Sequence, residues 1–181
     1  MNKGPLISVV MPARNVEKFI GEAIESILVQ TLSDFELIII NDGSTDKTLC
    51  IIDSYAKRDD RIVVITRENK GLVDSRNEGI QKAKGEYIAK MDADDISLPD
   101  RFEKQIKLMK KKNLDVCGAY IQEFNESSQN IRQQYFPLKD QDIKFTLMFM
   151  SAFAQPVVMM KKRIFDLLQY CDSFPYAEDY K

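Results

Sequence analysis

The chain has 181 residues, of which 44% are hydrophobic and 30% are charged, a composition typical of one globular domain with a substantial core. Its net charge of -2 provides no global basic field and argues against a nucleic acid as partner. With no histidine and three widely spaced cysteines, it favours neither imidazole chemistry nor a zinc site or a disulfide framework.

The first half of the chain alternates between strand and helix patterns. Short apolar runs rich in β-branched residues predict strands at residues 6–11, 35–40, 61–66 and 87–91. Helices are predicted from Asn15, as an N-cap, to residue 28, at 45–55 with Ser44 as cap, at 72–83 with Gly85 as C-cap, and from Pro99 to residue 112. This alternation predicts a doubly wound α/β fold with a mostly parallel sheet flanked by helices.

The second half is less regular. It predicts strands at residues 116–122 and 156–160, a turn at 126–130, and helices at 140–153 and 163–168. No apolar run reaches the roughly 20 residues that span a bilayer, and the N-terminus lacks a signal-peptide pattern. We therefore expect a soluble, cytoplasmic protein.

Polar motifs follow three of the predicted strands. They are Pro12-Ala13-Arg14-Asn15, Asn41-Asp42-Gly43-Ser44-Thr45-Asp46 and Asp92-Ala93-Asp94-Asp95. In open parallel sheets, ligands bind beyond the carboxyl ends of the strands. The three motifs are therefore expected to converge on one crevice.

Three carboxylates within four residues make the motif after the fourth strand the most informative. They repel one another unless a cation or hydrogen-bond donors offset the charge. In an extended segment, Asp92 and Asp94 would point to the same side. Mg²⁺ or Mn²⁺ accepts such oxygen ligands together with substrate phosphate, which predicts a metal-diphosphate site. A solvated acidic loop at a helix start is an equally good interpretation of these four residues alone.

Asp42 and Arg76 are the other candidates for binding chemistry. A turn with a helix cap explains Gly43 and Ser44 but not Asp42, whose carboxylate would accept a hydrogen bond from a nucleobase imide, as in uridine diphosphate. Arg76 suits a diphosphate, although an exposed helix arginine is the alternative. The GxGxxG and GxxxxGK[ST] fingerprints are absent, so metal and side chains would bind the phosphates.

Taken together, these motifs closely resemble glycosyltransferase family 2. The resemblance rests on the order and spacing of residues 8–15, 30–31, 35–46, 76–80, 85–88 and 91–95. It implies a GT-A fold with a Rossmann-like nucleotide-binding sheet. It also implies inverting transfer of a sugar from a nucleotide-diphosphate donor, UDP-linked, to a saccharide or lipid-linked acceptor in polysaccharide or glycoconjugate synthesis.

The resemblance also assigns roles to individual residues. Asp42 would meet the base, Arg76 would lie nearby, Asp92 would contact the ribose and Asp94 would bind Mg²⁺ or Mn²⁺. The base pocket would be lined by Pro12, Ala13 and Asn15. Family members carry an acidic pair in the second half, which Glu178-Asp179 matches, and Asp179 would be the general base.

Two departures from the family pattern stand out. Gln155-Pro156 replaces a His-Pro pair found in many members, and the chain stops at Lys181, where members continue through a helix that holds the acidic pair. We therefore expect a single GT-A domain over residues 1–181, with a nucleotide-sugar-binding half at 1–112 and the start of an acceptor-binding half at 113–181. A truncated, non-catalytic nucleotide-sugar-binding module is the alternative.

Two surfaces are candidates for contact with partners. Lys107 and the run 110–112 would attract the anionic inner face of a membrane, with a solvated helix end as the alternative. The apolar residues 145–153 would contact an acceptor or a second subunit in a homo-oligomer, but packing in the core is the favoured interpretation.

Overall fold

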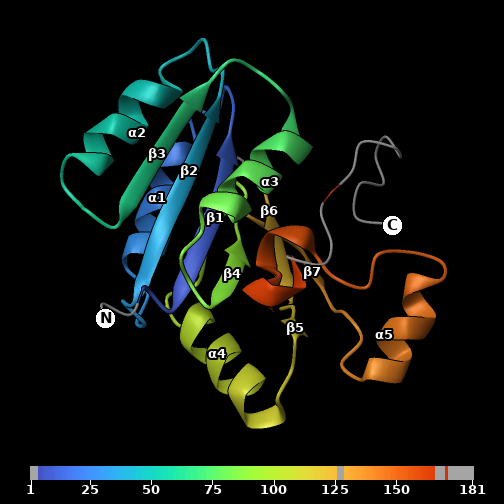
Figure 1. The fold of residues 1–181 in the computed structure, drawn as a ribbon. Coiled ribbons are helices and arrows are strands. Elements are labelled where there is room, and N and C mark those ends of the chain that lie inside the picture. Colours follow the sequence, from blue (N-terminus) through green and yellow to red (C-terminus); the bar gives the residue numbers. More distant parts are fainter. Residues whose placement is uncertain (1–3, 126–128, 166–169, 171–181) are drawn as a thin grey trace.

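The computed structural model describes residues 4–125, 129–165 and 170. Its main sheet has six strands in the order β3-β2-β1-β4-β8-β5 (Figure 1), and β6 and β7 pair with each other in a separate two-stranded ribbon. The four strands at the β3 end of the sheet are parallel. The predicted α/β class with a mostly parallel sheet is confirmed.

The four parallel strands are β1 (Ile7–Ala13), β2 (Phe35–Asp42), β3 (Ile62–Arg67) and β4 (Tyr87–Lys90). Every residue of β2 is buried, which its apolar residues 37–40 predict and its polar residues Glu36, Asn41 and Asp42 do not. The chain adds β2 and β3 on one side of β1 and then returns to place β4 on the other side. The winding therefore reverses between β1 and β4, and a ligand crevice is expected at the carboxyl ends of these two strands.

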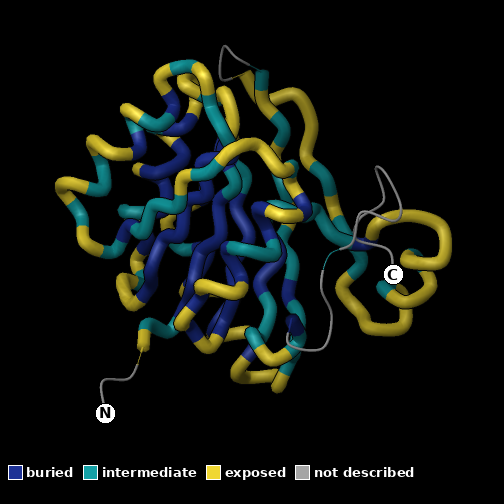
Figure 2. The backbone as a smooth tube through the Cα atoms, turned by 45° about the horizontal axis from the view of Figure 1, so that its top comes forward, coloured by how far each residue is buried: buried dark blue, intermediate teal, exposed yellow. Residues whose placement is uncertain are grey.

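Helices cover both faces of this sheet. α1 (Ile20–Leu28), α2 (Thr48–Ala56) and α4 (Arg101–Lys112) bury side chains in one apolar cluster, whereas α3 (Leu72–Lys82) packs on the opposite face. Successive residues of β1 serve the two clusters in turn, since Val9 and Met11 belong to the first and Val10 to the second. In Figure 2 the buried strands form the dark centre between these layers.

The second half of the chain is built from shorter elements. They are β5 (Val116–Cys117), β6 (Ile121–Phe124), β7 (Asn130–Gln134), α5 (Asp140–Leu147), η1 (Gln155–Val157), β8 (Met159–Lys161) and η2 (Lys162–Ile164). β8 runs antiparallel to both β4 and β5 and so completes the sheet. The single strand predicted at 116–122 is wrong, because the chain leaves the sheet after Cys117 and forms β6 in the separate ribbon.

Several predicted helix boundaries are wrong. Asn15 is no N-cap, since it has a positive φ of 52° and α1 begins only at Ile20. Ser44 does not cap α2, which begins at Thr48; the Asp46 carboxylate accepts the Thr48 N–H instead, at 3.0 Å. α4 begins at Arg101, two residues after Pro99. Side-chain oxygens near these helix starts join neighbouring loops, as described below.

Most of the apolar segment 145–153, predicted to pack in the core, is exposed, although Ala152 within it is buried. Phe145, Phe149 and Met150 are 62%, 72% and 64% exposed, and α5 has no buried residue. α5 ends at Leu147, short of the predicted residue 153, and lies to one side of the sheet at the right of Figure 1. Among the described residues, no helix combines the length and the apolar character needed to cross a membrane.

Gly85 has a tertiary role rather than the predicted role of C-cap. α3 already ends at Lys82, and a Cβ added to Gly85 would lie 2.6 Å from the backbone nitrogen of Ser8 and 2.7 Å from the carbonyl carbon of Ile7. Backbone atoms cannot give way as a side chain can, so Gly85→Ala should lower the free energy of unfolding by about 1–3 kcal/mol in urea titrations.

Gly21→Ala is the matched control for this prediction. Gly21 lies within α1, where an added Cβ would make an ordinary contact of 3.5 Å with the Tyr55 hydroxyl. The alanine is therefore expected to stabilise the protein by about 0.5–1 kcal/mol, because glycine loses more backbone entropy on folding. Equal effects of the two substitutions would contradict the close backbone approach at Gly85.

Candidate functional site

The candidate site lies at the carboxyl ends of the parallel strands, where the winding reverses. A small pocket opens there between β1, β4 and α3, and its lining includes three of the predicted residues, Pro12, Arg76 and Asp92. Two of its lining residues, Lys90 and Tyr170, were not predicted from the sequence. Asp42 lies at the same edge of the sheet, at the end of β2.

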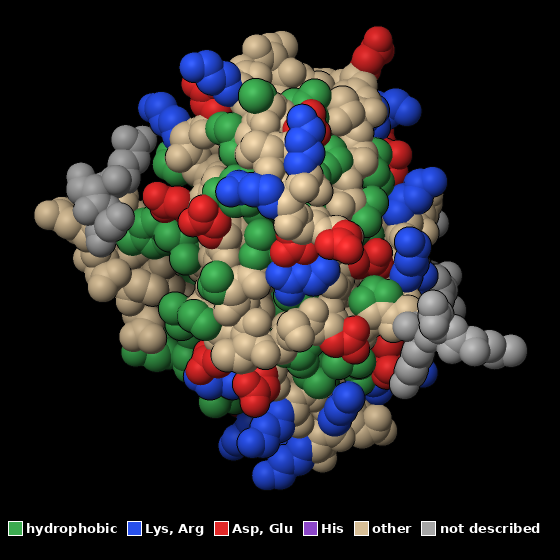
Figure 3. Space-filling model, turned by 90° about the vertical axis from the view of Figure 1, so that its left-hand side faces the viewer, with side chains coloured by type: hydrophobic (Ala, Val, Ile, Leu, Met, Phe, Trp, Pro, Cys, Tyr) green, Lys and Arg blue, Asp and Glu red, His purple; other side chains and the backbone are tan. Residues whose placement is uncertain are grey.

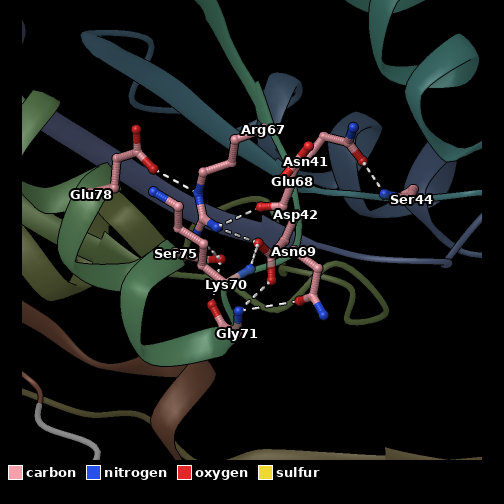
Figure 4. A network of polar contacts seen from close by, with 10 residues as sticks. All are labelled: Asn41, Asp42, Ser44, Arg67, Glu68, Asn69, Lys70, Gly71, Ser75 and Glu78. Atoms are coloured by element: carbon pink, nitrogen blue, oxygen red, sulfur yellow. Dashed lines mark hydrogen bonds and ion pairs between the residues drawn. The ribbon is translucent and has the colours of Figure 1, made fainter.

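Asp42 is buried and its carboxylate is closely held (Figure 4). Oδ1 accepts hydrogen bonds from Arg67 Nη1 at 2.5 Å and from the Lys70 N–H at 2.9 Å. Oδ2 accepts the Gly71 N–H at 2.9 Å. Within the described part of the chain, three N–H groups thus donate to this carboxylate.

Arg67 is the residue of this network that sequence reasoning missed. Its Nη2 donates to Ser75 Oγ at 2.9 Å, and its Nε forms an ion pair with Glu78 Oε2 at 2.7 Å that lacks hydrogen-bond alignment. Arg67 ends β3 and lies opposite Asp42 in the parallel register. A terminal arginine on the strand next to Asp42 was therefore the available signal, but the register was needed to interpret it.

Asn15 joins the loops after β1 and β2. Its Oδ1 accepts the Thr45 N–H at 2.8 Å, and its own N–H donates to Ser44 Oγ at 3.1 Å. Of the three residues expected to line a base pocket, Pro12 lines the pocket described above, Ala13 is buried beside Asn41 in the sheet, and Asn15 is exposed. Asn15 therefore positions the rim of the site through its backbone and side chain.

Arg76 and Asp92 face each other across the pocket. Arg76 projects from α3 and is buried, with Nη2 3.7 Å from Asp92 Oδ1, so the alternative of an exposed helix arginine is wrong. The Tyr170 ring centroid lies 5.6 Å from the Arg76 guanidinium carbon. Asn77 clamps Tyr170 at both backbone groups, donating to its carbonyl at 3.0 Å and accepting its N–H at 3.1 Å.

Lys90 adds a second buried cation to this pocket. Its ammonium contacts the side-chain oxygen of Gln155 and lies 4.9 Å from the Tyr170 ring centroid. Gln155, which departs from the family's histidine, thus supplies a neutral acceptor next to the pocket. The acidic pair that contains Asp179 lies outside the described residues.

The acidic motif turns after β4 rather than continuing as an extended segment, since the Asp95 N–H donates to the Asp92 carbonyl at 3.3 Å. Asp94 is exposed, and Asp95 is partly buried. Burial, followed by the Asp92 and Asp94 carboxylates, raises the pKa of Asp95 to about 6, against an opposing effect of Arg101. The three carboxylates of Asp92, Asp94 and Asp95 therefore place negative charge close together at the end of β4.

This charge suits a divalent cation that also binds a phosphate. Among the described residues, no three His, Cys, Asp or Glu side chains are grouped so that they could hold a metal ion by themselves. Mg²⁺ typically binds one or two carboxylates and takes its other oxygens from water and substrate phosphate. The motif fits a cation bound together with a diphosphate.

The raised pKa of Asp95 predicts a pH-dependent stability. The folded protein keeps this proton up to about pH 6, whereas the unfolded chain releases it near 3.8, so the contribution of Asp95 to stability falls as pH rises between these values. Asp95→Asn should therefore stabilise the protein more at pH 7 than at pH 4 in urea titrations with a chelator present. Asp53→Asn, on the exposed side of α2, is the control. Equal gains at both pH values would contradict the burial of Asp95.

Comparison with known proteins identifies the family. The family model for Glycosyl transferase family 2 matches residues 8–167, from the second residue of β1 to beyond η2. The chain belongs to glycosyltransferase family 2. The family predicted from the strand-end motifs is confirmed.

Curated relatives of this family 2 chain support the assignment. It is 38% identical to the O-antigen biosynthesis glycosyltransferase WbnJ of Escherichia coli, covering 97% of this chain and 69% of that protein. It is 35% identical to an uncharacterized glycosyltransferase of Haemophilus influenzae, covering 100% of this chain and 60% of that protein. The chain thus spans somewhat more than half the length of these relatives.

Solved structures confirm the GT-A fold of this family 2 chain. S. aureus TarS in complex with UDP matches with a TM-score of 0.76 at 23% identity, over 96% of this chain and 52% of that one. The mannosyltransferase PcManGT of Pyrobaculum calidifontis, in complex with GDP-Man and Mn2+, matches with a TM-score of 0.70 at 16% identity, over 95% and 49%. At these identities the likeness concerns the fold alone.

The basic end of α4 lies apart from this site. Lys110, Lys111 and Lys112 form the last turn of α4, and Lys107 is exposed on the turn before it. In Figure 3 basic side chains gather at the lower end of the molecule, at the height where α4 ends in Figure 1, whereas the rest of that face mixes both signs. Association of this end with an anionic membrane stays a prediction.

Proposed function

We propose that this chain is the donor-binding part of an inverting glycosyltransferase that uses a UDP-sugar in the synthesis of a polysaccharide or glycoconjugate. The observation that carries the proposal is the buried, closely held Asp42 carboxylate at the same sheet edge as the Arg76–Asp92 pair. The O-antigen role of WbnJ and the UDP bound to TarS are consistent with it.

The hydrogen-bonding capacity of Asp42 favours uracil as the base. A carboxylate has about four acceptor positions, of which Arg67, Lys70 and Gly71 fill three. One position is left on Oδ2, which matches the single N3–H donor of uracil. Cytosine presents an acceptor at this position of the ring, and guanine presents two adjacent donors. A uridine nucleotide is therefore the best fit.

Asp92 and Arg76 would bind the next parts of the donor. Asp92 is 37% exposed at its side chain and would accept hydrogen bonds from the ribose hydroxyls. Arg76 would offer its guanidinium to the diphosphate, whose oxygens it matches in geometry and charge. Pro12, Ala13 and Asn15 would form the wall and rim beside the base.

Asp94 would hold Mg²⁺ or Mn²⁺, with the charge of Asp92 and Asp95 close by. Once bound, the cation would offset charge on the diphosphate as it leaves. Asp94 is exposed and can therefore be reached by a cation that enters with the donor.

Asp179 would act as the general base. Its carboxylate would take the proton of the acceptor hydroxyl while the acceptor oxygen bonds to the anomeric carbon and the bond from that carbon to the diphosphate oxygen breaks. Attack from the face opposite the leaving group inverts the anomeric configuration, and Arg76 would stabilise the negative charge that develops. Such a base typically accelerates a reaction by about 10²–10⁴-fold.

Calorimetric titration of the unmodified chain with UDP and CDP, each with and without Mn²⁺, tests this proposal. UDP should bind about 10- to 150-fold more tightly than CDP, the effect of one hydrogen bond to a charged group. Mn²⁺ should strengthen the binding of UDP. Equal affinities for UDP and CDP would argue against base recognition by Asp42, and binding that is independent of metal would argue against the site at Asp94.

A further inference from the structure

The proposed function uses Arg67 only as one of three donors to Asp42, although its side chain is only 11% exposed and meets four polar partners, Asp42, Ser75, Glu78 and the Glu68 carbonyl. Buried arginine is costly unless its charge is paired, and here both Asp42 and Glu78 provide negative charge. Arg67 lies between Asp42 at the end of β2 and the α3 residues Ser75 and Glu78 (Figure 4). Arg67 thus contacts the residue proposed to bind the base, Asp42, and two residues of α3 beside it.

The contacts of Arg67 close a ring around Asp42. Arg67 donates to Asp42 and to Ser75 Oγ, the Ser75 hydroxyl donates to the Gly71 carbonyl at 2.8 Å, and the Gly71 N–H donates back to Asp42. Gly71 has φ 94°, a conformation that glycine adopts without strain, and it directly precedes α3. The ring therefore ties the ends of β2 and β3 to the start of the helix that carries Arg76.

We infer that Arg67 is a positioning residue that sets the base selectivity of the donor site through Asp42. The inference rests on the proposed function. By occupying one acceptor position of Oδ1, Arg67 leaves Asp42 with one open position, on Oδ2, instead of one on each oxygen. A carboxylate with a single open position suits the one imide donor of uracil.

Removing Arg67 raises the number of open acceptor positions on Asp42 from one to two. Both oxygens of Asp42 then have one open position, an arrangement that pairs with two parallel N–H donors. Guanine presents such a pair at N1 and at its exocyclic amine, whereas uracil presents one donor between two carbonyl oxygens. Loss of Arg67 is therefore expected to weaken UDP binding and to spare or strengthen GDP binding.

The test compares the unmodified chain with Arg67→Met and Arg67→Lys in titrations with UDP and GDP. The ratio of UDP to GDP affinity should fall on the order of tenfold in Arg67→Met, the size of one charged hydrogen bond. Arg67→Lys should lower the ratio less, because its ammonium keeps the charge beside Asp42 but cannot also reach Ser75 and Glu78. Arg61→Met is the control, since Arg61 precedes β3 and pairs with Asp59 at 2.8 Å.

The outcomes separate this inference from the proposed function. An unmodified chain that binds no uridine nucleotide overturns both. If the unmodified chain prefers UDP but Arg67→Met weakens UDP and GDP by the same factor, Arg67 only supports the structure and the inference fails. Should Arg67→Met not fold, Arg67→Lys decides, and an unchanged ratio in that variant overturns the inference.

Discussion

Asp179→Asn should lower the rate constant kcat of sugar transfer, or of donor hydrolysis, by about 10²–10⁴-fold while UDP affinity stays within about twofold. The amide has the size of the carboxylate but cannot take a proton at neutral pH. Because a general base acts on the acceptor in the transition state, its loss lowers kcat without weakening the donor complex. Steady-state kinetics and calorimetric titration with UDP measure the two quantities.

Asp53→Asn, an identical change on the exposed side of α2, should leave both quantities unaltered. An Asp179→Asn variant that turns over at the unmodified rate would remove Asp179 from the role of base. The unmodified chain also decides between the two proposed kinds of protein. Tight UDP binding with no hydrolysis at high protein concentration would favour the non-catalytic nucleotide-sugar-binding module.

Asp42→Asn should weaken UDP binding by about 10- to 150-fold, the effect of losing one hydrogen bond to a charged acceptor. The amide replaces one carboxylate oxygen with an N–H donor, which then faces either the uracil N3–H or one of the N–H groups of Lys70 and Gly71. It also leaves the buried Arg67 without its closest counter-charge. Calorimetric titration with UDP, with urea unfolding in parallel, measures the effect.

The control for this change is Asp59→Asn. Asp59 also pairs with an arginine, Arg61, whose hydrogen bond is the main cause that lowers the pKa of Asp59. This pair lies just before β3, at the opposite end of that strand from Arg67. The variant should lose stability without losing UDP affinity. A comparable loss of UDP affinity in both variants would attribute the effect of Asp42→Asn to destabilisation.

The sequence predicted the parallel half of the fold well and the second half poorly. The predicted bounds of β1 to β4 lie within two residues of the observed ones. Strands that are buried on both faces consist largely of apolar residues, which can be recognised directly in the sequence. In contrast, residues 116–124 contain one apolar pattern but enter two sheets, and the apolar residues 147–150 at and after the end of α5 are exposed. The local sequence shows which segments are apolar enough to be buried, whereas tertiary contacts decide which of them are buried.

By itself, the sequence determined the fold class, the family and the gathering of Asp42, Arg76 and Asp92 at one edge of the sheet. The fold class follows from local periodicity, and the shared edge of Asp42 and Asp92 follows from the rule that the carboxyl ends of parallel strands lie together. The family and the place of Arg76 follow from the resemblance of the motifs to glycosyltransferase family 2. Only the tertiary structure decided that Arg67 fills an acceptor position of Asp42, 25 residues away in the chain. Such a contact depends on strand register and side-chain direction, which local sequence does not encode.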